Sequence, residues 1–209
     1  MKNNPSNYTL NVVEIFHSIQ GEGANTGKSA VFVRLGSCNM SCWYCDTDWT
    51  SSSKMTVRQI MEEVKKLSNN NEYPKCLLIW TGGEPTLQLT DEILEFFPEY
   101  CNCIETNGTN PVPTKIEYIS CSPKVSPVVL RKNFTHVNEY RYPIEVGDIL
   151  PDIAELPVAD NYFVSPIFLG VEKERFQQVN KNIEYSISFI KKNPTWRLSI
   201  QIHKLLNIP

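Results

Sequence analysis

The fold of this chain is constrained most by a set of short apolar runs. Each run ends in a pair of glycine, proline or small polar residues. They occupy 76–80, 100–106, 116–121 and 162–164, and end in Gly82-Gly83, Asn107-Gly108, Ser122-Pro123 and Ser165-Pro166. Continuous apolar runs of this length are typical of parallel strands covered on both faces. Alternating or apolar segments predict further strands at 8–16, 28–35, 142–146 and 196–202.

Helical patterns separate several of these runs. Thr56 begins a helix, because Gln59 follows at the spacing of a capping box and apolar residues recur every three or four positions up to Leu67. Two more helices are expected at 91–97 and 176–190, whereas 127–140 fits either a helix or an irregular crossover. The alternation predicts an α/β fold with a parallel sheet.

The number of strands limits the architecture further. The segments 8–16 and 28–35 could form a hairpin, and the six or so other strands in 209 residues are too few for a closed eight-stranded barrel. We therefore expect an incomplete (β/α)6-type barrel, with an open sheet as the alternative, in a single domain over 1–209. The glycine and proline pairs follow the carboxyl ends of the strands, which is the edge where α/β folds bind ligands.

Composition excludes several classes of function. The chain carries 20 Lys and Arg against 23 Asp and Glu, a net charge of −3, and no basic stripe, so we do not expect it to bind nucleic acid. No apolar run approaches the roughly 18 residues of a membrane span, and the polar start of the chain does not resemble a signal peptide. A cytoplasmic, reducing location is expected.

Three of the seven cysteines lie close together, in a loop expected at 36–53. Cys38, Cys42 and Cys45 have the spacing C-x3-C-x2-C, which in a reducing compartment indicates a metal or cluster site rather than disulfides. One interpretation is structural zinc, which needs a fourth ligand from a histidine or a distant cysteine. The other is an iron–sulfur cluster with one iron left for an exogenous ligand. The remaining cysteines lie in apolar strands and are expected in the core: Cys76, Cys101, Cys103 and Cys121.

The cysteine motif, with Tyr44 before its last thiol, resembles the signature of the radical S-adenosylmethionine enzymes. Thr81-Gly-Gly-Glu-Pro85 is similar to the loop that contacts the cofactor's amino group in that superfamily. The resemblance implies a 4Fe-4S cluster whose open iron binds S-adenosylmethionine, and a radical SAM partial barrel. Small residues let backbone approach a ligand closely, and Glu84 is expected to pair with an ammonium group.

Most of the chain resembles one family of that superfamily, 7-carboxy-7-deazaguanine synthase. The similarity rests on Ser18-Ile-Gln-Gly-Glu-Gly23, Phe32 to Gly36, Cys38 to Thr47, Thr81 to Pro85, Glu105 to Gly108, Ser122 to Lys124 and Gln201 to Pro209. It implies conversion of 6-carboxy-5,6,7,8-tetrahydropterin to 7-carboxy-7-deazaguanine by a radical ring contraction with loss of ammonia, in queuosine or deazapurine biosynthesis. No protein group is assigned a catalytic proton transfer, because the cofactor carries the difficult step.

The resemblance also implies roles for individual residues. Thr47 would bind Mg²⁺, and Arg34 would bind the substrate carboxylate, a task that suits a guanidinium. The expected substrate-binding residues are Ile19, Gln20, Gly21, Glu22, Arg34, Thr81 and the C-terminal Pro209. The expected cofactor-binding residues are Tyr44, Cys45, Asp46, Gly83, Glu84, Ser122, Pro123, Lys124, Val164, Ser165, Pro166 and Ile167. The chain departs from the family at Ser165, where a glutamine is expected.

Partners and rival functions complete the expectations. The resemblance implies an electron donor such as flavodoxin or ferredoxin, and a homodimer. An activating enzyme for glycyl-radical proteins would share the cluster and the loop at 81–85, but Gln20, Glu22 and Arg34 suit a small polar ring better than a peptide. A zinc- or cluster-binding module without activity would need neither the glycine pair nor Thr47.

Overall fold

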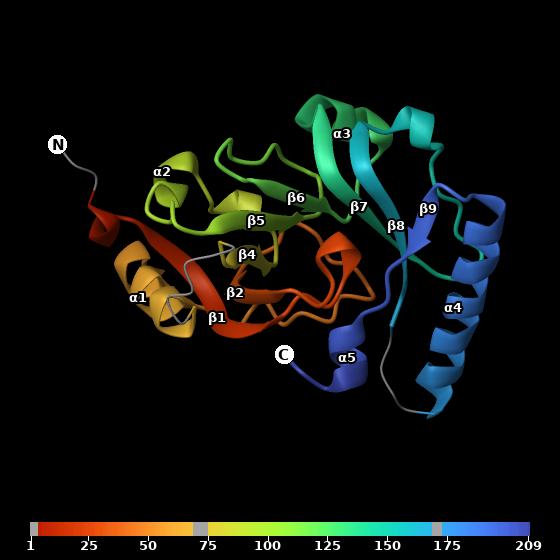
Figure 1. Ribbon diagram of the computed structural model, residues 1–209, viewed down its shortest axis with the longest axis horizontal. Coiled ribbons are helices and arrows are strands. Elements are labelled where there is room, and N and C mark those ends of the chain that lie inside the picture. The colour runs from red at the N-terminus through yellow and green to blue at the C-terminus, as the bar shows by residue number, and fades with distance from the viewer. Residues whose placement is uncertain (1–3, 69–74, 169–172) are drawn as a thin grey trace.

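The computed structural model describes residues 4–68, 75–168 and 173–209, and these residues contain one nine-stranded sheet (Figure 1). Its strand order is β3-β1-β2-β4-β5-β6-β7-β8-β9. The strands are β1 (Thr9–Ile19), β2 (Ser29–Leu35), β3 (Ser53–Thr56), β4 (Leu77–Gly82), β5 (Cys101–Thr106), β6 (Tyr118–Cys121), β7 (His136–Ile144), β8 (Val158–Pro166) and β9 (Trp196–Leu198).

Most of the sheet is parallel. β2 pairs with β4, and each later strand pairs with the next in a parallel ladder as far as β9. β1 is antiparallel to both β2 and β3. Within the described residues β3 and β9 have no ladder between them, so the curved sheet is not closed. The predicted incomplete barrel is confirmed.

The helices lie around the outside of the curved sheet, except for α5, which lies below β1 and β2 in Figure 1. They are α1 (Val57–Leu67), α2 (Asp91–Leu94), α3 (Pro127–Asn133), α4 (Lys173–Lys192) and α5 (Ile202–Leu206). The predicted capping box of α1 is present, with Thr56 N–H donating to Gln59 Oε1 at 2.8 Å. Among the described segments, no helix is both long and apolar enough to cross a membrane.

Two predicted elements need correction, and one element was missed. The ambiguous segment 127–140 contains α3 and most of β7, so the strand predicted at 142–146 is only the end of a longer one. The short strand β3 pairs with β1 and was not predicted. The last strand ends at Leu198, because the chain then turns back and Ile202 N–H donates to the carbonyl of Gly21 at 3.1 Å, where α5 begins.

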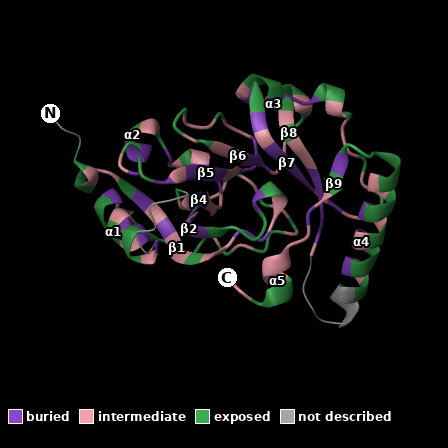
Figure 2. Ribbon diagram, in the orientation of Figure 1, coloured by how far each residue is buried: buried purple, intermediate pink, exposed green. Residues whose placement is uncertain are grey.

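Alternation along β2 separates the core from the interior of the barrel. Val31, Val33 and Leu35 are buried in the cluster that also holds the apolar face of α1 (Figure 2). Ala30 and Phe32 belong to a smaller cluster with residues of β4 and β5 on the other face. Because side chains alternate along a strand, Arg34 shares this inner face and lies at its carboxyl end.

Candidate active site

The carboxyl ends of the parallel strands surround a cavity of about 280 Å³. A smaller cavity of about 130 Å³ lies beside it and shares six lining residues with the first: Glu22, Tyr44, Ser122, Lys124, Arg141 and Gln201. Most of the residues predicted from the sequence line one of the two. In the larger cavity these are Ile19, Gln20, Gly21, Glu22, Arg34, Cys38, Cys42, Tyr44, Cys45, Thr81, Gly83, Ser122, Lys124 and Pro209. Four predicted residues line only the smaller cavity: Asp46, Ser165, Pro166 and Ile167.

The cysteine loop between β2 and β3 packs against the turn that follows β4. Glu84 N–H donates to the carbonyl of Ser37 at 2.9 Å. A Cβ atom on Gly83 would lie 1.9 Å from that same carbonyl oxygen, so a larger residue would push the two loops apart. Gly82 has φ +118 and equally little room beside Leu35. The glycine pair therefore holds the cysteine loop against the end of β4.

The three thiols of Cys38, Cys42 and Cys45 line the same cavity. A tight turn joins the last two, with Cys45 N–H donating to the carbonyl of Cys42 at 3.1 Å. Burial raises the pKa of the Cys38 thiol. In the described part of the chain, no group of three or more His, Cys, Asp or Glu side chains is placed to hold one metal ion. The thiolates of a cubane cluster bind different irons and need not converge on one point, so the set suits a cluster better than zinc.

The histidines considered as a fourth zinc ligand have other neighbours. His17 Nε2 lies 2.7 Å from Ser29 Oγ, and His136 Nε2 lies 2.8 Å from Asp160 Oδ1. His203 lines the cavity on the side of Gly21.

The carboxylate of Glu84 is fully buried, and four hydrogen-bond donors of the protein surround it. Its Oε1 accepts hydrogen bonds from Thr86 N–H, Thr86 Oγ1–H and Thr106 Oγ1–H at 3.0, 2.6 and 2.9 Å. Its Oε2 accepts from Asn107 N–H at 2.7 Å. Glu84 lines neither cavity, because its oxygens tie the turn after β4 to the end of β5.

Arg34 and Thr47 lie together at the edge of the cavity. The guanidinium of Arg34 donates from Nε to Glu14 Oε1 at 2.8 Å and from Nη1 to Thr47 Oγ1 at 3.3 Å. It also lies over the ring of Phe16, 5.5 Å from its centroid, and that ring stacks on Phe32. Thr47 itself lines neither cavity. The arrangement leaves a cation facing the cavity beside an apolar wall.

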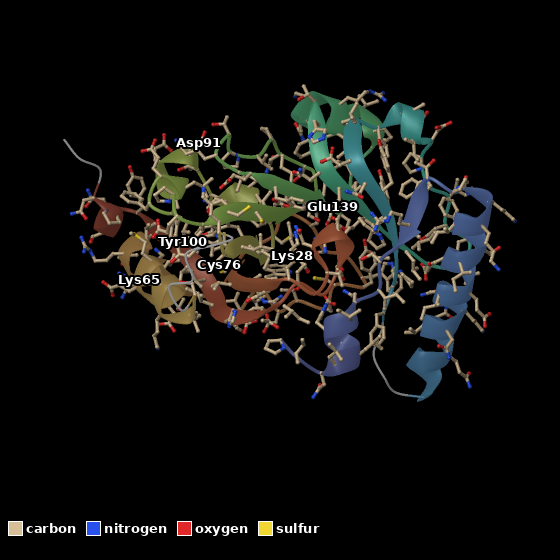
Figure 3. The ribbon with its side chains drawn as sticks, in the orientation of Figure 1. Lys28, Lys65, Cys76, Asp91, Tyr100 and Glu139 are labelled. Carbon is tan, nitrogen blue, oxygen red and sulfur yellow. The ribbon has the colours of Figure 1, made fainter. Side chains whose placement is uncertain are left out.

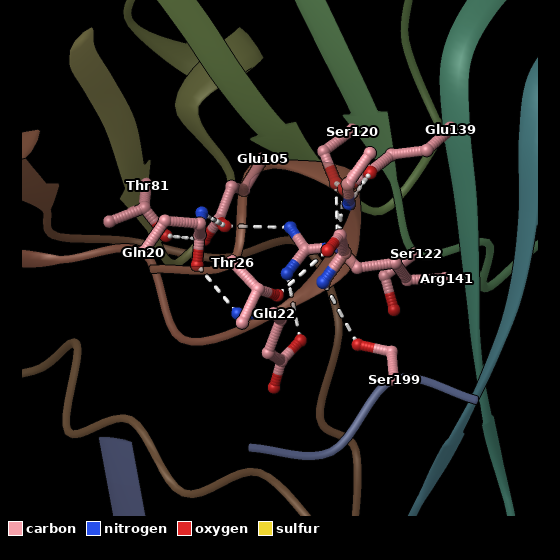
Figure 4. A network of polar contacts seen from close by, with 12 residues as sticks. Gln20, Glu22, Thr26, Thr81, Glu105, Ser120, Ser122, Glu139, Arg141 and Ser199 are labelled. Carbon is pink, nitrogen blue, oxygen red and sulfur yellow. Dashed lines mark hydrogen bonds and ion pairs between the residues drawn. The ribbon is translucent and has the colours of Figure 1, made fainter. Parts of the chain in front are cut away.

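A network of charged side chains that was not predicted forms the other wall (Figure 4). Arg141 of β7 pairs with Glu22, Glu105 and Glu139 through contacts of 2.7, 2.6 and 3.1 Å. Glu105 also accepts hydrogen bonds from Gln20 Nε2 at 3.0 Å and Thr81 Oγ1 at 2.7 Å. The sequence contained a signal for this network, because charged residues such as Glu139 and Arg141 between the apolar residues of one strand indicate a polar interior. The signal was missed because the strand was predicted at 142–146.

The charge of Glu105 depends on this network. Burial opposes ionisation of its carboxyl group, but the Arg141 guanidinium, with the hydrogen bonds from Arg141, Thr81 and Gln20, lowers the pKa to about 2. A charged carboxylate therefore faces the cavity at any physiological pH.

The smaller cavity brings together cationic and small polar groups. Lys124 Nζ donates to the carbonyl and hydroxyl of Ser122 at 3.0 and 2.9 Å, lies over the ring of Tyr44, and has a pKa lowered by burial. Lys204 pairs with Asp46. Ser165 is 9% exposed, and its hydroxyl has no hydrogen-bond partner among the described residues.

Two residues expected at the cofactor lie behind these walls. Pro123 and Val164 line neither cavity. Val164 is fully buried, and its carbonyl accepts from Ser199 N–H at 2.9 Å. Both lie next to lining residues in the chain, Ser122 and Ser165, and so position them.

The segment 201–209 contributes to the lining of the larger cavity. Gln201, His203 and Pro209 all line it, and Ser18 Oγ donates to the carbonyl of Pro209 at 2.8 Å. Burial lowers the pKa of His203. Gln201 and His203 were part of the motif recognised in the sequence, but no role was assigned to them.

Comparisons with known proteins agree with this geometry. A family model for the radical SAM superfamily matches residues 33–125. The 7-carboxy-7-deazaguanine synthases of Bacteroides thetaiotaomicron and Haemophilus influenzae are each 37% identical to this chain, over 93% and 95% of it and 96% and 94% of their own lengths. The crystal structure of QueE from Escherichia coli has the same fold, with a TM-score of 0.66 and 22% identity over 96% of this chain and 99% of its own. The chain belongs to the 7-carboxy-7-deazaguanine synthase family of the radical SAM superfamily.

Proposed function

We propose that this protein is a radical SAM lyase that converts 6-carboxy-5,6,7,8-tetrahydropterin to 7-carboxy-7-deazaguanine with loss of ammonia. The observation that carries the proposal is one cavity lined by the three cysteines, by the Arg34 cation and by the Glu22 and Glu105 carboxylates. The thiols suit an iron–sulfur cluster, and the polar wall suits a small ring that carries both N–H donors and a carboxylate.

When bound, the cluster and S-adenosylmethionine supply a 5′-deoxyadenosyl radical that abstracts hydrogen from the substrate. Cys38, Cys42 and Cys45 would hold the cluster. Lys124, an ammonium between the two cavities, would face the cofactor carboxylate. Gly83 lines the same cavity and would contribute its backbone to the cofactor site, while its missing side chain lets the cysteine loop pack against the turn after β4.

The polar wall would bind and orient the substrate. Arg34 uses two of its N–H groups on Glu14 and Thr47, and its planar fork suits the substrate carboxylate. Gln20, Glu22 and Glu105 would accept and donate hydrogen bonds at the edge of the pterin ring. The stacked rings of Phe16 and Phe32, with centroids 4.9 Å apart, would exclude water from the same cavity.

Three finer assignments belong to the same proposal. Thr47 would bind Mg²⁺, with water and substrate oxygens completing the octahedron that this ion requires. Support comes from the hydroxyl's position beside Arg34, where the substrate carboxylate would lie. We also propose flavodoxin or ferredoxin as the reductant and a homodimer as the assembly; the resemblance to the family supports both.

Anaerobic reconstitution tests the function. We expect about four irons per chain, broad visible absorption, and formation of the deazapurine, detected by mass, from the tetrahydropterin, S-adenosylmethionine and a reductant. Cys42→Ala should lose the product, whereas Cys76→Ala, which changes a cysteine outside both cavities, should retain it. Colourless protein carrying zinc, or a cluster-bearing protein that makes no deazapurine, would refute the assignment.

A further inference from the structure

We propose that Arg141 is the positioning residue of the substrate site, which holds the carboxylates of Glu22 and Glu105 in place as two acceptors for the N–H edge of the pterin ring. The proposal rests on the function proposed above and names a determinant of its specificity. Arg141 lies on β7, in a segment whose structure the sequence did not predict.

The contacts of Arg141 join three parts of the chain at the cavity wall (Figure 4). Nη1 binds Glu22 Oε2, in the turn after β1, at 2.7 Å, and Nη2 binds Glu105 Oε1, on β5, at 2.6 Å. Nε lies 2.6 Å from Ser120 Oγ and 3.1 Å from Glu139 Oε1. The residue is only 6% exposed. A planar guanidinium can serve these directions at once, whereas the single ammonium of a lysine cannot.

The three carboxylates around Arg141 are not equivalent. Glu139 is 2% exposed and lines neither cavity. Its oxygens accept from Ala24 N–H, Tyr118 OH and Ser120 Oγ at 2.8, 2.9 and 2.8 Å. A Cβ atom on Gly23 would lie 2.2 Å from this carboxylate, so it also fixes the turn that carries Glu22. Glu139 therefore anchors the network from behind.

Glu22 and Glu105 line the larger cavity together with Arg141 itself. Their side chains are 15% and 25% exposed, which leaves part of each carboxylate open to a ligand. While it is ionised, a carboxylate accepts hydrogen bonds and donates none. Two of them fixed side by side match a ring with adjacent N–H donors, such as the 2-amino-4-oxopyrimidine edge of a pterin.

Arg141 also keeps the Glu105 acceptor charged. The groups that face Glu105 are the cation of Arg141, the hydrogen-bond donors Gln20 and Thr81, and nearby Cys103 and His203. Lys124 and Glu22 lie around the same guanidinium. Without the Arg141 charge, burial would dominate and raise the pKa of Glu105. The carboxyl group would then gain a proton as the pH falls, and the acceptor would be lost.

The test measures binding rather than turnover. The fluorescent, oxidised analogue 6-carboxypterin is titrated into cluster-reconstituted wild type, Arg141→Met and Arg141→Lys between about pH 5.5 and 8.5. Arg141→Met should bind the analogue at least about tenfold more weakly than wild type, since one buried partner of a charge pair has been removed. The affinity of this variant should also increase as the pH rises. Arg141→Lys should bind about fivefold more weakly than wild type but keep its pH profile. His203 is present in all three proteins, so its titration cancels in the comparison.

Two further measurements separate the possible failures. Glu105→Gln in the Arg141→Met background should abolish the added pH dependence, because the titrating group is gone. Unchanged pH profiles in Arg141→Met would overturn the proposal. If that variant does not fold, an Arg141→Lys protein with wild-type affinity for the analogue would overturn it instead. A wild type that does not bind 6-carboxypterin at all would refute the proposed function rather than the role of Arg141.

Discussion

The ring of His203 lies so close to Gly21 that a Cβ atom at position 21 would come within 2.0 Å of its Nδ1. The backbone is joined at the same point, where Ile202 N–H donates to the carbonyl of Gly21. Gly21 therefore admits the segment 201–209 to the mouth of the cavity, and its lack of a side chain is a condition for closing the site.

Gly21→Ala should displace His203 and open the substrate side of the cavity. We expect binding of 6-carboxypterin to weaken at least about tenfold, since a misplaced cavity wall loses several contacts at once, and cluster content to stay unchanged. Fluorescence titration measures the first and iron analysis the second. In a His203→Ala background the same substitution should have little further effect, because the clashing ring is gone. Equal losses in both backgrounds would show that the ring is not the cause.

Glu84→Gln should destabilise the fold, because an amide would point a donor at backbone and hydroxyl donors in a buried place. We expect a loss of about 3 kcal/mol, which lowers Tm by roughly 6–12 °C in a chain of this size. Differential scanning calorimetry measures it, with Glu99→Gln at an exposed position as the control. An unchanged Tm together with weaker S-adenosylmethionine binding would restore the role expected from the sequence, that of ammonium partner.

Removal of Mg²⁺ should slow wild type about tenfold or more, since the ion would share the substrate carboxylate with Arg34. Thr47→Ala should already be slow, and chelation should change it little. Initial rates of deazapurine formation with and without added Mg²⁺ decide between these outcomes. Thr50→Ala, in the same loop but bonded to Asp48, should respond like wild type. Equal slowing of Thr47→Ala and wild type would count against a metal at Thr47.

Thr56→Ala should lower stability by about 1 kcal/mol, or roughly 2–4 °C in Tm, because it removes half of a capping box. Activity should be unchanged, since α1 lies outside the sheet. Thr90→Ala is the matched control, because Thr90 precedes α2 without a side-chain capping bond. A thermal scan in which the two variants lose equally would mean that the box contributes nothing.

The parts of the fold that could be predicted are those whose signal is local. The capping box at Thr56 and the apolar runs that became β4, β5 and β6 depend only on neighbouring residues. β7 failed because its interior carries Glu139 and Arg141, which break the apolar pattern of a strand. Their reason is tertiary, since Arg141 pairs with Glu22 in the turn after β1 and with Glu105 of β5, and Glu139 accepts from the Ser120 hydroxyl of β6.

The site shows the same division. Short motifs predicted the thiols, the glycine pair and Arg34, and the structure places them on one cavity. The hydrogen-bond partners of Glu84 could not be predicted from its own motif, because Thr106 and Asn107 lie at the end of β5 and just after it. Cys76 was expected in the core from local hydropathy alone. In the structure it lies near Tyr100 (Figure 3), a neighbour that hydropathy could not predict.

The hydrogen bond between Ser18 and Pro209 joins residues 191 positions apart. Such long-range contacts form slowly and late in folding. During synthesis, which proceeds at about 5–20 residues per second, the mouth of the cavity cannot close before residue 209 has left the ribosome. The thiols at 38–45 will have emerged well before that moment. If the cluster is delivered during translation, it can therefore reach the cysteines before residues 201–209 have packed at the cavity.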